Sequence, residues 1–236
     1  MKAARRPERV ADRIAEKLRA AIVGGRLRPG DALPSERELA TQYDVNRSSI
    51  REAMGRLETW GLVKIRHGGA TRVSDFLMSA GLDLLPHLVE IGGKVDPEIL
   101  EDLHGIRGML LGWCAEVAAR KANANDVERL EALVVQLSDP KTKSGALQVL
   151  DYDFYQELVR ISGNRVLGLF SNVVRDVYLK GRDRFTGLYA RDVFDSSHHR
   201  VAVAAIRARD GAKAGAAMRA HAASALSTLE KKGGTP

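Results

Sequence analysis

The sequence predicts a mainly α fold in two parts: an N-terminal part with a small β-hairpin, and a C-terminal all-α antiparallel bundle of about seven helices. Two short helical patterns and a Gly-turned ribbon follow one another between Ser35 and Val73. Most of the excess positive charge lies within residues 1–78, and after Ser74 apolar residues recur at helical spacing without convincing strand alternation. We therefore expect one domain over residues 1–78 and a second over residues 79–236.

The two N-terminal helical patterns each begin with a capping signal. Ser35 and Glu38 form the S-x-x-E pattern in which each side chain bonds the other residue's backbone N–H. Asn46 is an N-cap type, and Val45 and Ile50 are spaced to form a hydrophobic staple across the first turn. The sequence thus predicts two closely spaced helices.

The second of these helices has the pattern of a recognition helix. Ile50, Met54 and Leu57 recur at helical spacing and are expected to face inward. The outward N-terminal end then carries two arginines and two small hydroxyl residues: Arg47, Ser48, Ser49 and Arg51. Arginine can pair with a guanine edge, and hydroxyls can approach phosphates. The alternative is an ordinary solvated helix face.

A basic hairpin is expected after the second helix. Residues 62–66 and 70–74 are predicted as two short strands around the turn formed by His67, Gly68 and Gly69. The succession of two helices and a basic hairpin favours a DNA-binding unit more specifically than any one of these elements does alone.

The motifs PSERELA, NRSSIREAMGRLETWGLV and HGG resemble the winged helix-turn-helix of the GntR family of bacterial transcription regulators, over most of residues 7–74. This resemblance implies double-stranded DNA as a partner. Asn46 stands where many members carry Ser or Thr, so capping and DNA contact both stay open for it. The implied DNA-contacting residues are Arg37, Asn46, Arg47, Ser48, Ser49, Arg51, His67 and Gly68, the last two entering the minor groove from the wing tip.

The charge is distributed as this resemblance implies. Residues 1–78 contain 16 Lys and Arg against 10 Asp and Glu, a net charge of +6, whereas residues 79–236 contain 21 against 20, a net charge of +1. One polyanion-binding module and one near-neutral module fit this asymmetry better than a uniformly basic chain would.

The single cysteine, Cys114, lies among apolar residues, which excludes a disulfide framework and indicates a buried thiol in a reducing compartment. No run approaches the length of a membrane span, and the charged N-terminus lacks the apolar core of a signal peptide. We expect a cytoplasmic protein with no membrane partner.

Turn chemistry divides the second part into helices. Residues 71–93 read as a connector that is helical after Ser79, with leucines on one face to dock it onto the bundle. Helices are expected to begin near Ser79, Pro97, Asn125, Ser144, Asn164, Arg191 and Ala212.

The stretches DYDFYQELVRISGNRVLGLF, SSHHRVAVAAIRARD and AAMRAHAASAL resemble the effector domain of the FadR subgroup of the same family. The connector and the first stretch are most similar to the acyl-CoA-responsive regulators of fatty acid metabolism in that subgroup. The resemblance implies a homodimer on a palindromic operator, whose DNA affinity is controlled by a fatty acyl-CoA. A metal-dependent regulator that responds to small carboxylates is the alternative.

The resemblance also implies a candidate metal and effector site. Many relatives bind a divalent metal with one Asp and three His, and the matching residues here are Asp151, Tyr155, His199 and His221. A phenol is a poor ligand at neutral pH, so Tyr155 weakens the site and no cofactor is expected to be required. A weak zinc or nickel site on Asp151, His199 and His221 and a metal-free polar cluster closed by the Tyr155 hydroxyl stay open.

Arg107 matches an arginine that faces the effector cavity in this subgroup, where it would hold a carboxylate or phosphate. Its alternative role is a salt bridge with Asp151 or Glu101. Six apolar residues are candidates either for a lipid pocket or for plain core: Leu110, Leu111, Trp113, Leu169, Val173 and Val177.

The competing function class is a metal-assisted hydrolase that uses Asp151, His199 and His221. The chain has no Ser nucleophile motif, Walker loop or dinucleotide fingerprint. A hydrolase would also leave the basic N-terminal part unexplained. We therefore expect a regulator and not an enzyme.

Overall fold

The computed structural model describes residues 10–66, 69–91, 94–95, 97–175 and 189–231. It divides into two compact units, residues 1–94 and 95–236, which are treated separately below. This division falls later than the boundary after residue 78 that the sequence suggested.

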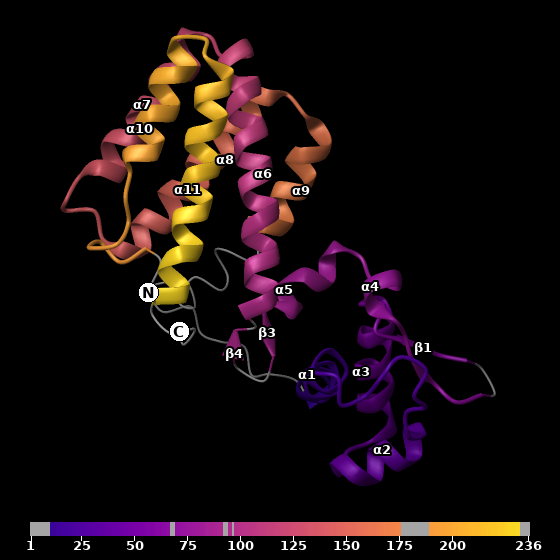
Figure 1. Ribbon diagram of the computed structural model, residues 1–236. Helices are drawn as coiled ribbons and strands as arrows, with labels where there is room; N and C mark the ends of the chain where they lie inside the picture. Colours follow the sequence, from indigo (N-terminus) through magenta and orange to yellow (C-terminus); the bar gives the residue numbers. More distant parts are fainter. Residues whose placement is uncertain (1–9, 67–68, 92–93, 96, 176–188, 232–236) are drawn as a thin grey trace. The chain divides into compact units, whose positions relative to one another are not determined.

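The first unit is built on three longer helices and a small antiparallel hairpin (Figure 1). Helix α1 packs against α3, and α2 packs against α3. In the hairpin Val63 pairs with Val73 and Lys64 with Arg72. The elements are α1 (Val10–Val23), α2 (Glu36–Tyr43), α3 (Arg47–Thr59), β1 (Val63–Lys64) and β2 (Arg72–Val73).

Both predicted capping signals are confirmed. The Ser35 backbone N–H donates to Glu38 Oε2 at 2.8 Å, and the Glu38 N–H donates to Ser35 Oγ at 3.3 Å. The Ser49 N–H donates to Asn46 Oδ1 at 2.8 Å. These bonds satisfy donors that a helix start leaves unpaired, and they set where α2 and α3 begin. The wing strands are shorter than predicted, with only two residues each among the described residues.

The connector packs onto the first unit, which corrects our expectation that its leucines dock onto the bundle. It consists of short pieces, α4 (Phe76–Ser79), η1 (Leu82–Leu84) and α5 (Leu85–Leu88), instead of one helix beginning at Ser79. Leu84 is fully buried in the core that also contains Leu18, Ile50 and Leu57. The spacing of the leucines indicated that the connector has an apolar face to bury, but it did not indicate in which core that face is buried. A further short pair, β3 (Glu90–Ile91) with β4 (Lys94–Val95), follows where no strand was expected.

The second unit is an all-α bundle, so the predicted mainly α fold is confirmed. Among the described residues it contains six helices: α6 (Pro97–Lys121), α7 (Ala124–Ser138), α8 (Ser144–Ser162), α9 (Arg165–Arg175), α10 (Ser197–Arg207) and α11 (Gly211–Lys231). Helices α6 and α11 run side by side along much of their length, and α8 packs against α6 (Figure 1).

The helix expected at Arg191 begins instead at Ser197. Residues 191–193 form a turn, and Asp195 Oδ1 accepts from the Ser197 N–H at 2.8 Å. This acidic acceptor marks the helix start, because a side-chain oxygen there satisfies an end N–H that the helix cannot. The turn brings Tyr189 and Phe194 into the bundle, where both are buried.

Candidate functional site

The predicted DNA-contacting residues of the first unit lie on its surface. Arg37, Arg47, Ser48 and Arg51 are exposed, whereas Ser49 is half-buried. They come from α2 and from the first turns of α3, whose other face supplies core residues. The helix N-terminus and the arginines together suit contact with phosphates and base edges. Asn46 caps α3, as the resemblance left open, and His67 and Gly68 lie outside the described residues.

One contact on this surface was not anticipated. Arg51 Nε donates to Glu36 Oε2 at 2.8 Å, which joins α3 to the start of α2. Both side chains are solvent-exposed, so the pair contributes little stability. Nothing in the spacing of residues 36 and 51 pointed to this pair.

The connector packs against the C-terminal end of the recognition helix, α3. Gly61 has φ +71°, and a Cβ there would lie 2.8 Å from Ala80 Cα. Ser79 Oγ donates to the Gly61 carbonyl at 3.0 Å, and the rings of Trp60 and His87 lie 4.4 Å apart. A movement of the connector would therefore be transmitted to α3.

In the second unit, Asp151 is the centre of a buried polar cluster drawn from distant parts of the chain. Its Oδ1 lies 2.9 Å from His199 Nε2 and 2.8 Å from His221 Nε2. Its Oδ2 accepts from Arg107 Nη2 at 2.5 Å and from the Tyr189 hydroxyl at 2.8 Å. Helices α6, α8, α10 and α11 and the segment before α10 thus meet at one carboxylate.

Aromatic rings enclose this cluster and keep water from it. Phe154 meets the His199 ring edge-on at 4.8 Å between centroids. Phe194 stacks on Tyr189 at 5.8 Å and meets the His221 ring at 6.1 Å. In such a site an unpaired charge would be costly, so the pairing of Asp151 matters.

The buried surroundings set the protonation of the cluster. Burial alone would raise the pKa of Asp151, but the positive charge of Arg107 and the contacts with His221 and His199 hold it well below its usual range. Burial lowers the pKa of His221 to about 4, although the neighbouring Asp151 carboxylate opposes that shift. At neutral pH the carboxylate is therefore ionised and His221 is uncharged.

Comparison with known proteins identifies both units. The family model described as bacterial regulatory proteins, gntR family, matches residues 10–73, and the FCD domain model matches residues 102–224, more than half of the chain. HTH-type transcriptional regulator Mce2R of Mycobacterium tuberculosis is 35% identical over 171 residues, 72% of this chain and 70% of that protein. The chain belongs to the GntR family of bacterial regulatory proteins. It is a DNA-binding transcription regulator with an FCD domain and not an enzyme.

Other matches of this GntR-family regulator agree in fold and kind. Fatty acid metabolism regulator protein of Cronobacter sakazakii is 29% identical over 181 residues, 76% of this chain and 74% of that protein. The solved structure of Lar, which is described as controlling the expression of the Listeria monocytogenes agr system, has a TM-score of 0.58 over 96% of this chain and 99% of that chain. Its sequence is 14% identical, so it shows the fold alone. None of the described helices combines the length and apolar character that crossing a bilayer requires.

The phenol hydroxyl that the structure shows bonded to Asp151 is that of Tyr189. Tyr155 is buried in the bundle core and lies edge-on to Tyr152, with ring centroids 6.2 Å apart. Tyr189 lies in an irregular segment with no helical periodicity, so no signal in the sequence pointed to it. The alternative role of Arg107, an ion pair with Asp151, is present in the structure, and its guanidinium is turned into the cluster.

Among the described residues, the donor set that could hold a divalent ion has three members. Asp151, His199 and His221 each offer a ligand atom within 4.8 Å of the others. Carboxylate and imidazole are ligand types that bind zinc, and Asp151 Oδ1 lies 2.9 Å from His199 Nε2 and 2.8 Å from His221 Nε2. Neither Nδ1 atom of the two imidazoles has a hydrogen-bond partner among the described residues, although metal-binding imidazoles usually have one. The donor types thus fit a divalent ion, whereas the supporting hydrogen bonds that metal-binding imidazoles usually make are not found among the described residues.

The six candidate lipid-pocket residues differ in their exposure. Leu111 is core, Leu110 is partly buried against that core, and Val173 is half-buried. Trp113 and Leu169 are exposed, and Val177 lies outside the described residues. The plain-core interpretation is therefore correct for Leu111.

Proposed function

We propose that this GntR-family regulator binds a palindromic operator as a homodimer and that an effector bound in the FCD domain controls its DNA affinity. The proposed reading surface consists of Arg37, Arg47, Ser48, Ser49 and Arg51, with His67 and Gly68 at the wing tip and Asn46 as the cap of α3. The contacts of the connector with the end of α3 support a mechanical link to this surface. Membership of a DNA-binding regulator family and the absence of a membrane-crossing helix among the described residues fit action in the cytoplasm.

The effector is, we propose, a fatty acyl-CoA. The similarity to proteins named fatty acid metabolism regulator, over about three quarters of the chain, is the observation that carries this proposal. The cluster of Arg107, Asp151, His199 and His221 would respond to its anionic part, with Tyr155 in the adjoining core. It needs no cofactor for charge balance, because Arg107 and Asp151 neutralise each other.

A second candidate is a small carboxylate bound together with a divalent metal. Asp151, His199 and His221 would hold the ion, which would supply positive charge for the carboxylate. Since Arg107 already balances Asp151, a divalent ion alone would leave an uncompensated charge of +2 in a buried site. Metal and anion should therefore bind together and only weakly apart.

A thermal-shift series separates these candidates. Chelator-treated protein is compared with acyl-CoA, free fatty acid, or small carboxylates such as citrate, each with and without zinc or nickel. A rise in Tm with acyl-CoA alone supports the first candidate, because a ligand that binds the native state stabilises it. A rise that requires both carboxylate and metal would support the second and overturn the first.

Operator binding tests the reading surface. Arg47→Ala and Arg51→Ala should each weaken operator binding by about 1–3 kcal/mol in a fluorescence anisotropy titration, while ligand affinity stays unchanged. Arg129→Ala, which removes an exposed arginine of α7, is the matched control and should leave DNA binding unchanged. Unchanged affinity in both test variants would refute the recognition-helix assignment.

A further inference from the structure

The polar cluster around Asp151 is closed to solvent. The side chains of Asp151, His199 and His221 are buried, and that of Arg107 is largely buried beside them. A ligand that acts on this cluster can therefore reach it only if part of the surrounding wall moves. Helices α6, α8, α10 and α11 each supply one of these four residues, so a helix that moved away would take part of the site with it.

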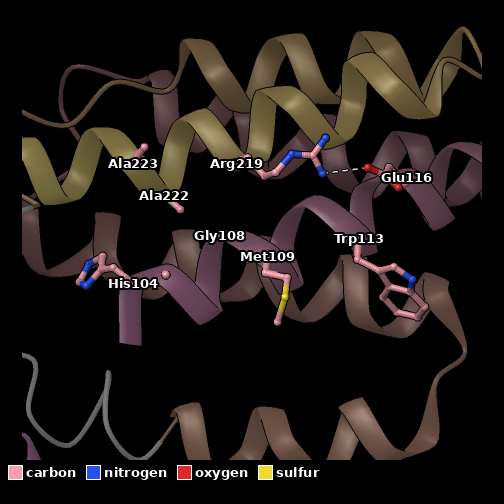
Figure 2. Close-up of a pocket in the computed structure, with 9 residues that line it drawn as sticks. His104, Gly108, Met109, Trp113, Glu116, Arg219, Ala222 and Ala223 are labelled. Carbon is pink, nitrogen blue, oxygen red and sulfur yellow. Dashed lines mark hydrogen bonds and ion pairs between the residues drawn. The ribbon is translucent and has the colours of Figure 1, made fainter. Parts of the chain in front are cut away.

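The groove between α6 and α11 does not lead to the cluster. It has a volume of about 520 Å³, and Met109, Trp113 and Arg219 are among its lining residues (Figure 2). The described residues that line it include none of the four polar residues of the cluster. A ligand in this groove would not meet the buried carboxylate.

One wall of the cluster is not helical. It is formed by residues 189–196, called the strap below, which consist of a turn and irregular backbone in front of α10. The Tyr189 hydroxyl donates to Asp151 Oδ2 at 2.8 Å. The ring of Phe194 lies 6.1 Å from that of His221, measured between centroids. Both aromatic side chains of the strap are buried, so the strap covers the cluster.

Side-chain hydrogen bonds hold the other end of the strap against α7. Arg191 Nη1 donates to the Leu137 carbonyl at 2.8 Å. The hydroxyls of Ser196 and Ser138 lie 2.9 Å apart and share a hydrogen bond. Leu137 and Ser138 are the last two residues of α7, so both bonds are made at one helix end.

The backbone of the strap bonds mainly to itself. The N–H groups of Val193 and Phe194 both donate to the Ala190 carbonyl at 2.9 Å. Residues 189–196 belong to no helix or strand. A short irregular segment held by a few side-chain bonds opens at a lower free energy than a packed core helix does. The strap can therefore move away while the helices that supply the cluster stay in place.

We propose that the strap is the entrance of the effector site, which opens when Arg191 and Ser196 leave the end of α7 and closes through the bond of Tyr189 to Asp151. This inference rests on the proposed effector site and adds how a ligand reaches it. In the closed state the Tyr189 hydroxyl occupies a position beside Asp151 Oδ2. An incoming ligand has to displace that hydroxyl, so the strap controls access to the cluster.

A disulfide that holds the strap closed tests this entrance. Ser138→Cys and Ser196→Cys, in a Cys114→Ala background, place two thiols where the native hydroxyls lie 2.9 Å apart. Bonded sulfurs lie about 2.05 Å apart, so a small adjustment suffices. Diethyl pyrocarbonate acylates accessible imidazoles, and peptide mass spectrometry reports the acylation of His221. We expect His221 to react at least about tenfold more slowly in the oxidised protein than in the reduced protein.

Two controls isolate the effect of the disulfide. His87 of the first unit, whose side chain is 34% exposed, should react equally in the oxidised and reduced proteins. The Cys114→Ala chain without the two new thiols should react at a rate that does not depend on reductant. Equal rates for His221 in the oxidised and reduced proteins would overturn the proposal.

Arg191→Met tests the same entrance without a crosslink. Loss of the bond to the Leu137 carbonyl should raise the rate of His221 acylation about tenfold, because hydrogen bonds from charged groups stabilise the closed state by about that factor. The matched control is Arg209→Met, which removes a similar bond from Arg209 Nη1 to the Ala119 carbonyl at 3.2 Å and should leave the rate unchanged. A rate in Arg191→Met equal to that of the parent would refute the entrance.

The entrance and the effector can fail separately, because acylation of His221 requires no ligand. If the oxidised and reduced proteins differ but no compound of the thermal-shift series raises Tm, the proposed effector is wrong and the entrance stands. If a compound raises Tm while the disulfide leaves the reactivity of His221 unchanged, the entrance is wrong and the effector site stands.

Discussion

Replacing Arg107 by methionine should lower the free energy of unfolding, because it removes the positive charge that compensates the buried Asp151 carboxylate. The substitution keeps most of the aliphatic volume but leaves Asp151 without the guanidinium that lies 2.5 Å from its Oδ2. Removing one partner of a buried ion pair costs about 3–5 kcal/mol, because the other charge stays buried. The side chain of Arg107 is 13% exposed and that of Asp151 is 3% exposed, so solvent screens this pair little.

The penalty should depend on pH because His221 can take up a proton in place of Arg107. Its Nε2 lies 2.8 Å from Asp151 Oδ1 and 3.3 Å from Arg107 Nη2, and the arginine contributes to the lowering of its pKa to about 4. In the variant the pKa of folded His221 should be higher than in the parent, because the opposing charge of Arg107 is gone while the Asp151 carboxylate still favours the protonated imidazole. Proton uptake by His221 then stabilises the folded variant at low pH, and this stabilisation is lost as pH rises through the folded pKa.

The parent should show the opposite trend. Its folded His221 has a pKa below the unfolded value, so the unfolded chain binds the extra proton and stability rises by about 1 kcal/mol from pH 6 to pH 8. In the folded variant, protonation of His221 is less favourable at pH 8 than at pH 6 by up to about 3 kcal/mol. The difference in unfolding free energy between parent and Arg107→Met should thus grow with pH.

Urea unfolding of chelator-treated protein at pH 6 and pH 8 measures this difference. A Trp60→Phe background leaves Trp113 as the reporter of the bundle. Arg219→Met is the matched control, since it removes an exposed ion pair with Glu116 and should cost less than about 1 kcal/mol at both pH values. A small, pH-independent penalty for Arg107→Met would refute the charge balance described above.

Three further changes test other features. Gly61→Ala should destabilise the first unit by about 1–3 kcal/mol in urea unfolding, because its Cβ would meet the Ala80 backbone at a φ of +71°, whereas Gly55→Ala, with open space, should not. Glu36→Gln should strengthen binding to unrelated duplexes by up to about 1 kcal/mol at low salt, because it removes the carboxylate beside Arg51; unchanged affinity would place that pair away from DNA. Cys114 should react with a thiol reagent only when the bundle unfolds, since burial raises its pKa to about 12; fast labelling of native protein would contradict this.

Local chemistry made parts of the fold predictable from sequence. The bonds between Ser35 and Glu38 and between Asn46 and Ser49 span three residues, so spacing alone specifies them. The destination of the connector depends on which distant core accepts Leu84, and no local pattern contains that information. Helix starts with a capping signal were accordingly more predictable than the packing of the connector.

The polar cluster shows the same limit at the level of the site. Asp151, His199 and His221 were found through the family resemblance, and the pairing of Arg107 with Asp151 was one of two alternatives. Tyr189 was missed because it lies in an irregular segment, where neither spacing nor residue type distinguishes a ligand from a surface residue. Contacts that join distant segments require the fold itself.

The closed state of this cluster restricts how an effector could act on it. Because Arg107 is already bound to Asp151, an anionic ligand can engage the guanidinium only by displacing the carboxylate or by bringing a cation that Asp151 can bind instead. Displacement alone would leave Asp151 buried and unbalanced unless His221 takes up a proton, so binding of a metal-free anion should strengthen as pH falls. Binding with a divalent ion should instead weaken as pH falls, because protons compete for the imidazole ligands. The sign of the pH dependence of effector affinity therefore distinguishes the two candidates even before the effector is known.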